Sequence, residues 1–474
     1  MRTAVIHYHL KPGGVTTVIK RQINATRSVN DYIVLTGEAP AGNDSAEDDS
    51  AGRFPAEIAV IPGLAYDDQP DRPEVSAEET VAAIIKAIRT KWNKGCDLIH
   101  IHNPLLAKNK QFLKIIRGLQ ASGMRLFLQV HDFAEDGRPR HYFADEPYPE
   151  NCHWGVINSR DRDILVAAGA RPEGVHLISN SVSPFKASRK RGRERLALYP
   201  VRAIRRKNIG EALLLSLFFE KVDQLAITLP PNSPADMPGY KSWQDFAGAH
   251  HLPVLFAASS SRAFDELVAE ATVMISTSIT EGFGFAFLEP WTAGKPLAGR
   301  KLPALCHDFE KGGVNLGHLY PSLSVPSDWL PTEELKQKIY RAAEAACRAF
   351  GIPFREEISG RFTAVADRPA VDYGMLDEPF QQMVLERVLS KSDDRARLKA
   401  DNPGLTFPEN ILEPEFIAAN NEAVRRAFAD TVAARQLVSA YQAAMDMPLT
   451  HRLDKQVLLD RFFNPDRFNL LQWG

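Results

Sequence analysis

The feature that most constrains this chain is its alternation of short apolar runs with stretches of helical periodicity. The apolar runs Thr3–Tyr8 and Asp97–His102 predict buried strands, and the segments Val15–Ile23 and Lys108–Gln120 that follow them have helical spacing. Strands separated by helices of this length form βαβ units, and such units build parallel sheets. The sequence therefore predicts an α/β fold.

The alternation pauses once and then restarts, which indicates two domains. The pause is Ser183–Arg195, a short, polar and very basic segment of the kind that links domains. A chain of 474 residues is also too long for one ordinary core, at about 100–200 residues per domain. We expect two doubly wound, Rossmann-like parallel-sheet domains facing across a cleft, over residues 1–185 and 186–447.

The C-terminal third follows a different pattern. Charge, proline and helix signals mix over residues 351–414, where we expect a helical insertion whose role the sequence does not reveal. Asn420–Met447 has a long helical pattern. The tail, 448–474, contains an amphipathic helix over Arg452–Phe463, which we expect to pack back on the first domain.

Bulk properties exclude several classes of function. A formal net charge of −2 does not suggest a nucleic-acid-binding protein. The first residues predict a strand rather than a secretory leader, and no stretch approaches the roughly 18 apolar residues of a membrane span. We therefore expect a cytoplasmic protein with free thiols. The chain has four cysteines, which form no CxxC pair: Cys96, Cys152, Cys306 and Cys347.

The strongest chemical motif is a glycine turn between two glutamates. Glu281 precedes Gly282, Phe283 and Gly284, after a predicted strand, and Glu289 begins a predicted helix. The glycines let the backbone approach a ligand closely, and the helix start offers N–H groups to a diphosphate. Carboxylates accept hydrogen bonds from paired sugar or ribose hydroxyls. A glycine-rich surface turn with two solvated glutamates is the alternative.

A basic run lies at another predicted strand–helix junction. Arg202 and Lys207 stand five positions apart within it, close enough to clamp both phosphates of a diphosphate. Such a clamp would also neutralise the charge that grows on a leaving diphosphate. The alternative is a solvated basic turn.

Two weaker motifs lie at strand ends in the first half. Gly13 and Gly14 follow the first strand, where a glycine pair lets a loop press on a ligand. His131 and Asp132 end a later strand, at the edge of a parallel sheet where ligands bind. His131 is a candidate to contact a sugar hydroxyl or carry a proton, with a structural histidine as the alternative.

The histidine pairs on two strands do not predict a metal site. Their i,i+2 spacing places each pair on one strand face, but acidic partner ligands are missing. These histidines are His7, His9, His100 and His102.

Taken together, the motifs resemble the retaining glycosyltransferases of family 4, which have the GT-B fold. The Glu-x7-Glu element of that family matches Glu281 and Glu289, and its Arg-x4-Lys pair matches Arg202 and Lys207. The resemblance spans about Met1–Pro303. Where members usually carry Lys-Gly, this chain has Lys-Asn.

The resemblance implies a role for each matching residue. Glu281 would bind the hydroxyls of the donor sugar and Glu289 the ribose, while Arg202 and Lys207 would hold the diphosphate. His131 would touch the transferred sugar. The glycine loop after the first strand, Gly13-Gly14, would lie against the donor.

The resemblance also implies the reaction. The second domain would bind a UDP- or GDP-sugar as substrate, with no cofactor and no metal, and the first would bind the acceptor. Retention would follow front-face attack, with the donor phosphate helping to take the acceptor proton. The sugar, the linkage, the oligomeric state and the acceptor, whether small molecule, glycan or lipid-linked, stay open.

Three alternatives remain. A nucleotide-sugar epimerase or hydrolase of the same fold would need a carboxylate pair such as Asp132 with Glu135 or Asp136. A non-catalytic nucleotide-sugar-binding protein would bind without turnover. A membrane-surface contact would use the basic, amphipathic segment Lys108–Gln120, which otherwise packs on its sheet.

Overall fold

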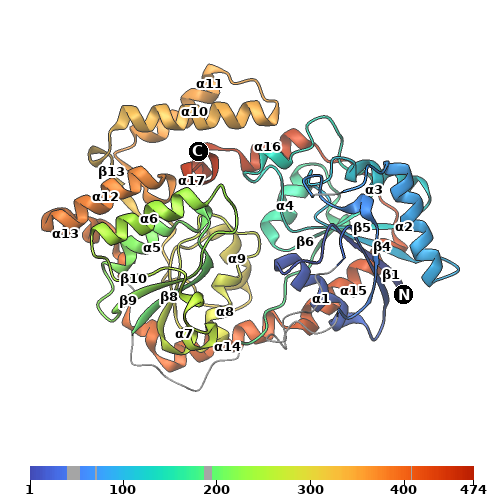
Figure 1. Cartoon of the computed structure of the whole chain (residues 1–474), viewed down its shortest axis with the longest axis horizontal. Coiled ribbons are helices and arrows are strands. Elements are labelled where there is room, and N and C mark those ends of the chain that lie inside the picture. The colour runs from blue at the N-terminus through green and yellow to red at the C-terminus, as the bar shows by residue number, and fades with distance from the viewer. Residues whose placement is uncertain (40–53, 70–71, 186–194, 407) are drawn as a thin grey trace. The chain divides into compact units, whose positions relative to one another are not determined.

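The chain folds into two compact units in a computed structural model (Figure 1). Unit 1 comprises Met1–Ser181 and Phe428–Phe463, and unit 2 comprises Val182–Ala427 and Asn464–Gly474. The structure describes residues 1–39, 54–69, 72–185, 195–406 and 408–474. Most of the linker expected at Ser183–Arg195 lies outside these described residues.

The C-terminal helices divide between the units differently from the sequence-based prediction. Helix α15 (Asp430–Asp446) belongs to unit 1 rather than to the second domain, and Tyr441 Oη on it lies 2.7 Å from His100 Nδ1. The last residues, Asn464–Gly474, belong to unit 2. An amphipathic pattern shows that one face of a helix is buried but does not show what covers it.

Unit 1 is built on a parallel sheet. In its described part the sheet has seven strands in the order β3-β2-β1-β4-β5-β6-β7. The strands are β1 (Arg2–His7), β2 (Asp31–Thr36), β3 (Glu57–Val60), β4 (Leu98–His102), β5 (Leu126–Val130), β6 (His153–Val156) and β7 (Val175–Leu177).

Helices cover both faces of this sheet because its strands are apolar on both sides. On β1, Ala4 and Ile6 pack into the core under one set of helices, and Val5 packs into the core under α1. The first set is α2 (Ala77–Lys91), α3 (Phe112–Ala121), α4 (Ser159–Ala167) and α16 (Lys455–Phe462). The opposite face carries α1 (Gly14–Thr26) and α15.

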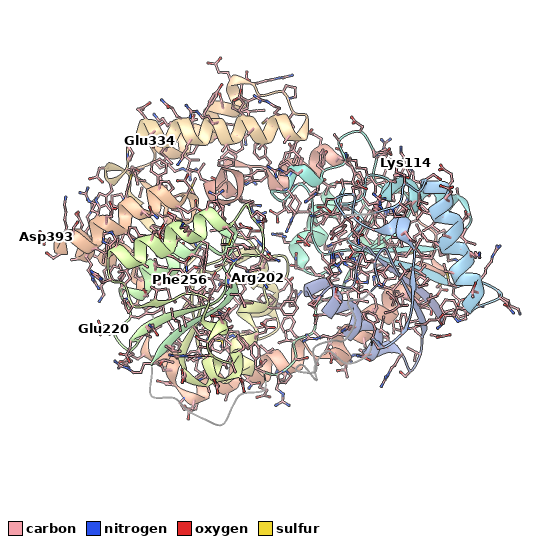
Figure 2. All side chains as sticks on the ribbon, in the orientation of Figure 1. Lys114, Arg202, Glu220, Phe256, Glu334 and Asp393 are labelled. Carbon is pink, nitrogen blue, oxygen red and sulfur yellow. The ribbon has the colours of Figure 1, made fainter. Side chains whose placement is uncertain are left out.

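The amphipathic segment proposed as a membrane contact is an ordinary sheet-covering helix. The apolar side chains of α3 that the sequence singled out are all buried in the unit 1 core, and Lys114 on its outer side is exposed (Figure 2). These apolar residues are Phe112, Leu113, Ile115 and Ile116. None of the described helices combines the length and the apolar character needed to cross a bilayer.

Unit 2 repeats the architecture with a smaller parallel sheet. In its described part the order is β10-β9-β8-β11-β12. The strands are β8 (Leu196–Arg202), β9 (Gln224–Leu229), β10 (Val254–Leu255), β11 (Ala271–Ser276) and β12 (Leu297–Gly299). A separate antiparallel ribbon pairs β13 (Ser324–Pro326) with β14 (Ala370–Asp372).

The inserted segment expected near residues 351–414 belongs to unit 2 and contributes several of its helices. Residues 351–406 and 408–414 form helices and loops, and also contribute β14. The α-helices are α5 (Ile209–Ser216), α6 (Met237–Ala249), α7 (Phe264–Glu270), α8 (Glu289–Thr292), α9 (Pro303–Lys311), α10 (Thr332–Phe350), α11 (Glu356–Thr363), α12 (Glu378–Ser390), α13 (Ser392–Asp401), α14 (Pro414–Ala427) and α17 (Leu470–Trp473).

Both sheets have a topological switch point. In unit 1 the chain leaves β1 towards β2 and leaves its neighbour β4 towards β5, at the opposite edge of the sheet. In unit 2 it likewise leaves β8 towards β9 and its neighbour β11 towards β12. Ligands of open α/β sheets bind beyond the carboxyl ends of the strands at such points. The prediction of two doubly wound α/β domains is confirmed. In unit 2 the switch point predicts a ligand site at the loops after β8 and β11.

Candidate functional site

The structure brings a lysine and a glutamate together at the switch point of unit 2. Lys207 lies in the loop after β8 and Glu281 in the loop after β11, and their side chains form an ion pair. Both side chains are largely buried, with exposed fractions of 14% and 10%. Arg206 Nη1 lies 3.7 Å from the other carboxylate oxygen of Glu281. One carboxylate thus faces two cations.

The cations keep Glu281 charged. Burial raises the pKa of this carboxyl, but the charges of Lys207 and Arg206 and hydrogen bonds from Lys207 and Ser278 lower it by more, so the net pKa lies below its ordinary value. Glu281 is therefore a carboxylate at neutral pH and can only accept hydrogen bonds.

The two loops are tied together by hydrogen bonds to main-chain carbonyls. Tyr199 Oη donates to the carbonyl of Lys207 at 2.7 Å, and Thr277 Oγ1 donates to the carbonyls of Lys207 and Asn208 at 3.0 Å each. The Ile279 N–H donates to the Arg206 carbonyl at 3.1 Å. The separation between Lys207 and Glu281 is thus held by the main chain as well as by their charges.

Arg202 and Arg206 have different neighbours, which their spacing in the sequence did not predict. Arg202 lies exposed at the end of β8 and donates to the carbonyl of Pro230 at 3.0 Å (Figure 2). Arg206, to which the sequence assigned no role, lies beside Glu281 instead. Successive residues of a 3₁₀ turn point about 120° apart, so a run of basic residues does not reveal which one meets a given partner.

The glycine turn after Glu281 has a conformation that requires glycine at one position. Gly284 has φ of 92°, and a Cβ there would lie 2.9 Å from Phe287 Cδ2. Phe283 is buried against Phe309, with ring centroids 5.5 Å apart. The turn is therefore anchored by an aromatic cluster. Gly282 lies at the start of this anchored turn, next to Glu281.

The helix start expected after this turn is short. A 3₁₀ turn over Phe285–Phe287 precedes α8, which has only four residues, and Pro290 in its first turn has no N–H. Its dipole is correspondingly small. Glu289, the first residue of α8, is half-buried. The basic side chains after β8, rather than a long helix, supply the positive charge at this edge of the sheet.

In unit 1, His131 follows β5 and is buried, with an exposed fraction of 5%. Its Nε2 lies 2.8 Å from Nδ1 of His102, so a ligand contact would use Nδ1. Burial lowers the pKa of His131 to about 4, with a smaller opposing contribution from Asp132. The imidazole is therefore neutral at pH 7.

Asn103 fixes the backbone at His131. Its own backbone is left-handed, with φ of 52°, and its Oδ1 accepts from the N–H groups of His131 at 2.8 Å and Asp132 at 3.1 Å. Asp132 Oδ1 in turn accepts from Arg138 at 2.6 Å. No motif in the sequence pointed to Asn103. Its signal is an asparagine directly after a buried strand, a residue type that tolerates left-handed backbone.

Gly13 and Gly14 lie exposed at the start of α1. Gly13 is extended, and a Cβ on Gly14 would meet nothing within 4 Å. Local packing therefore does not require glycine at either position, and the ligand role stays a prediction.

Two of the carboxylates proposed for an epimerase or hydrolase, Glu135 and Asp132, are held by neighbouring side chains. Glu135 has no exposed surface, Tyr148 Oη donates to it at 2.9 Å, and burial raises its pKa to about 7. Asp132 is engaged by Arg138. Among the described residues, no group of three His, Cys, Asp or Glu side chains could hold a metal ion.

Comparison with known structures identifies the fold of the chain. No family model matches the chain. HepE from Anabaena, in complex with UDP and glucose, superposes with a TM-score of 0.54 at 12% identity, over 93% of this chain and 99% of that one. A glycosyltransferase from Rickettsia africae gives 0.53 at 10% identity, over 94% and 98%. The chain has the GT-B fold. Both likenesses extend over nearly the whole length of this chain.

A curated relative is similar in sequence. Mannosylglucosyl-3-phosphoglycerate synthase from Petrotoga mobilis is 26% identical over 346 residues, which cover 65% of this chain and 66% of the relative. The chain therefore spans slightly less than two thirds of the length of this curated relative.

Proposed function

We propose that this protein is a retaining, metal-independent glycosyltransferase of the family 4 type, which moves a sugar from a UDP- or GDP-sugar to an acceptor hydroxyl. The observation that carries the proposal is the buried ion pair of Lys207 and Glu281 at the switch point of unit 2. HepE, which shares the fold, binds UDP and UDP-glucose. The relative from Petrotoga makes a glycosylated phosphoglycerate, as its name states.

The donor would lie across the loops after β8 and β11. Lys207, with Arg206 and Arg202, offsets the charge that develops on the diphosphate as the glycosidic bond breaks. Glu281 accepts hydrogen bonds from hydroxyls of the sugar, and Glu289 accepts them from the ribose. The glycines Gly282 and Gly284 let the backbone approach the donor, as Gly13 and Gly14 do in unit 1.

Retention would follow from attack on the same face that the diphosphate leaves. The acceptor oxygen bonds to the anomeric carbon, the bond to the diphosphate oxygen breaks, and the departing phosphate takes the acceptor proton. His131 is neutral, so it offers one hydrogen bond to the transferred sugar without adding charge. Glu135 has no exposed surface for contact with a donor, which disfavours an epimerase that would use this carboxyl.

The deciding experiment measures melting temperature with UDP, GDP and their glucose and mannose conjugates. A bound donor raises the melting temperature by mass action and identifies base and sugar together. Transfer is then assayed with that donor, starting with glycosylated phosphoglycerates as acceptors. Glu281→Ala should abolish transfer while the protein stays folded. Glu333→Ala, which removes a carboxylate with an 83% exposed side chain, is the control and should keep full activity.

Three outcomes contradict the proposal. Full transfer by Glu281→Ala would mean that the donor site is elsewhere. Release of nucleotide without an acceptor, at the rate of the complete reaction, would favour a hydrolase. Donor binding with no turnover across all acceptors would favour a binding protein.

A further inference from the structure

The side chain of Asn208, next to Lys207, is fully engaged in the interior of unit 2. Asn208 has φ of 53°, the left-handed region that favours glycine, and only 1% of it is exposed. Its Oδ1 accepts from Gln381 Nε2 at 2.8 Å, and its Nδ2 donates to Glu211 Oε2 at 2.6 Å. A glycine would adopt the same backbone but could make neither bond.

Gln381 belongs to α12, in the inserted region, and is itself held by the main chain. Its Nε2 also donates to the carbonyls of Tyr373 at 3.2 Å and Leu376 at 3.0 Å. One turn earlier on α12, Glu378 accepts from Nε and Nη2 of Arg205, both at 2.8 Å. Since residues three apart share a helix face, one face of α12 contacts both ends of the turn that contains Lys207.

The second partner of Asn208 is equally fixed. Glu211 has no exposed surface, accepts from Arg300 Nη2 at 2.7 Å and accepts from Tyr320 Oη at 2.8 Å. Arg300 also donates to Asp372 at 2.8 Å. The carboxylate that holds the Asn208 amide is therefore anchored from two sides.

Close packing adds to these hydrogen bonds. A Cβ on Gly210 would lie 2.3 Å from Gln381 Oε1 and 2.4 Å from Trp243 Cζ2. Gly210 thus lets α12 rest directly on the first turn of α5, two residues after Asn208.

We propose that Asn208 and Gln381 are positioning residues for the donor diphosphate, acting through Lys207. This inference rests on the proposed function. The amide of Asn208 locks the peptide plane that follows Lys207 from two directions, so the lysine side chain starts from a backbone that cannot reorient. A preordered cation binds a phosphate with less loss of entropy than a mobile one. The inserted region thereby supports the donor site through α12.

The test compares nucleotide binding by matched variants. Asn208→Gly keeps the left-handed backbone without strain but removes both bonds, and Gln381→Met removes the bond from the other side at similar volume. Gln382→Met is the control, because Gln382 lies on the same helix but bonds to Ser242 at 2.8 Å. Affinity for UDP and for GDP is measured by titration calorimetry, with Lys207→Met as the reference.

We expect Asn208→Gly and Gln381→Met each to weaken binding of the preferred nucleotide about tenfold, because Lys207 is no longer preordered, and Gln382→Met to leave it unchanged. In the transfer assay the donor KM should rise while the acceptor KM stays constant, a split that general destabilisation would not produce. If Gln381→Met does not fold, Asn208→Gly decides alone.

The possible failures are distinguishable. Wild-type nucleotide affinity in Asn208→Gly, with weakened affinity in Lys207→Met, would overturn the positioning role alone. Wild-type affinity in Lys207→Met would overturn the proposed function itself.

Discussion

His102 and His131 share a hydrogen bond in the interior of unit 1, with 2.8 Å between His102 Nδ1 and His131 Nε2. Their rings are nearly parallel, with an interplanar angle of 12°. Burial lowers the pKa of both, and neighbouring histidines contribute to the shift at His102, so both rings are neutral at pH 7. One ring must then donate and the other accept, so the tautomers of His102 and His131 are coupled.

This pairing predicts that His102→Asn lowers transfer about tenfold, although we expect His102 itself to contact no ligand. The reason is that the tautomer and orientation of the His131 ring are no longer held by His102. His131→Asn should lower transfer more, and the double variant should resemble it, since the two effects act through one bond. Initial rates at saturating donor give the comparison. His176→Asn is the control, because it removes a similar pair, His153 with His176, with ring nitrogens 2.9 Å apart. Additive effects would contradict the coupling.

Buried neutral histidines predict a loss of stability in acid. Burial lowers the pKa of His7 and His100 to about 3 and that of His131 to about 4. Between pH 6.5 and these values the unfolded chain takes up protons that the folded chain does not, so stability falls as pH falls. From pH 7 to pH 5 each such histidine should cost about 2 kcal/mol, measured by urea unfolding. His100→Gln should reduce this pH dependence.

The buried charges around Arg300 predict a large effect of removing one partner. Arg300→Met leaves the carboxylates of Glu211 and Asp372 without their cation, at an expected cost of about 3–5 kcal/mol in the free energy of unfolding. Chemical denaturation measures this directly. Arg195→Met removes the exposed pair with Asp223 and should not change the midpoint. Equal effects of the two substitutions would show that the buried cluster contributes no more than a surface pair.

The conformation of the glycine turn predicts that Gly284→Ala harms both stability and donor binding. Alanine is strained at φ of 92°, and its Cβ would press on Phe287, so we expect about 1–3 kcal/mol of destabilisation. Displacement of the turn should also move Glu281 and weaken nucleotide binding. Gly248→Ala, where a Cβ meets nothing within 4 Å, is the matched control in a helix and should stabilise slightly or have no effect. A folded Gly284→Ala protein with normal affinity would contradict this account of the turn.

Much of the fold was accessible from local pattern. Alternating strands and helices predicted parallel sheets, and the apolar stretches at Thr3–Tyr8 and Asp97–His102 are the neighbouring strands β1 and β4. The parallel arrangement also predicted that ligands bind at the carboxyl ends of the strands. Glu281 and Lys207, to which the family resemblance gives separate roles at a donor site, form an ion pair in the structure, and those roles stay predictions.

The sequence by itself determined the elements, the α/β class and the residue types available at the strand ends, because backbone periodicity and strand polarity are local properties. Only the tertiary structure decided that Arg206 rather than Arg202 lies beside Glu281, that Asn208 is held by Gln381, and that α15 covers the sheet of unit 1. These contacts join residues far apart in the chain. Their partners are selected by side-chain direction and by the close packing of whole elements, which no stretch of sequence records.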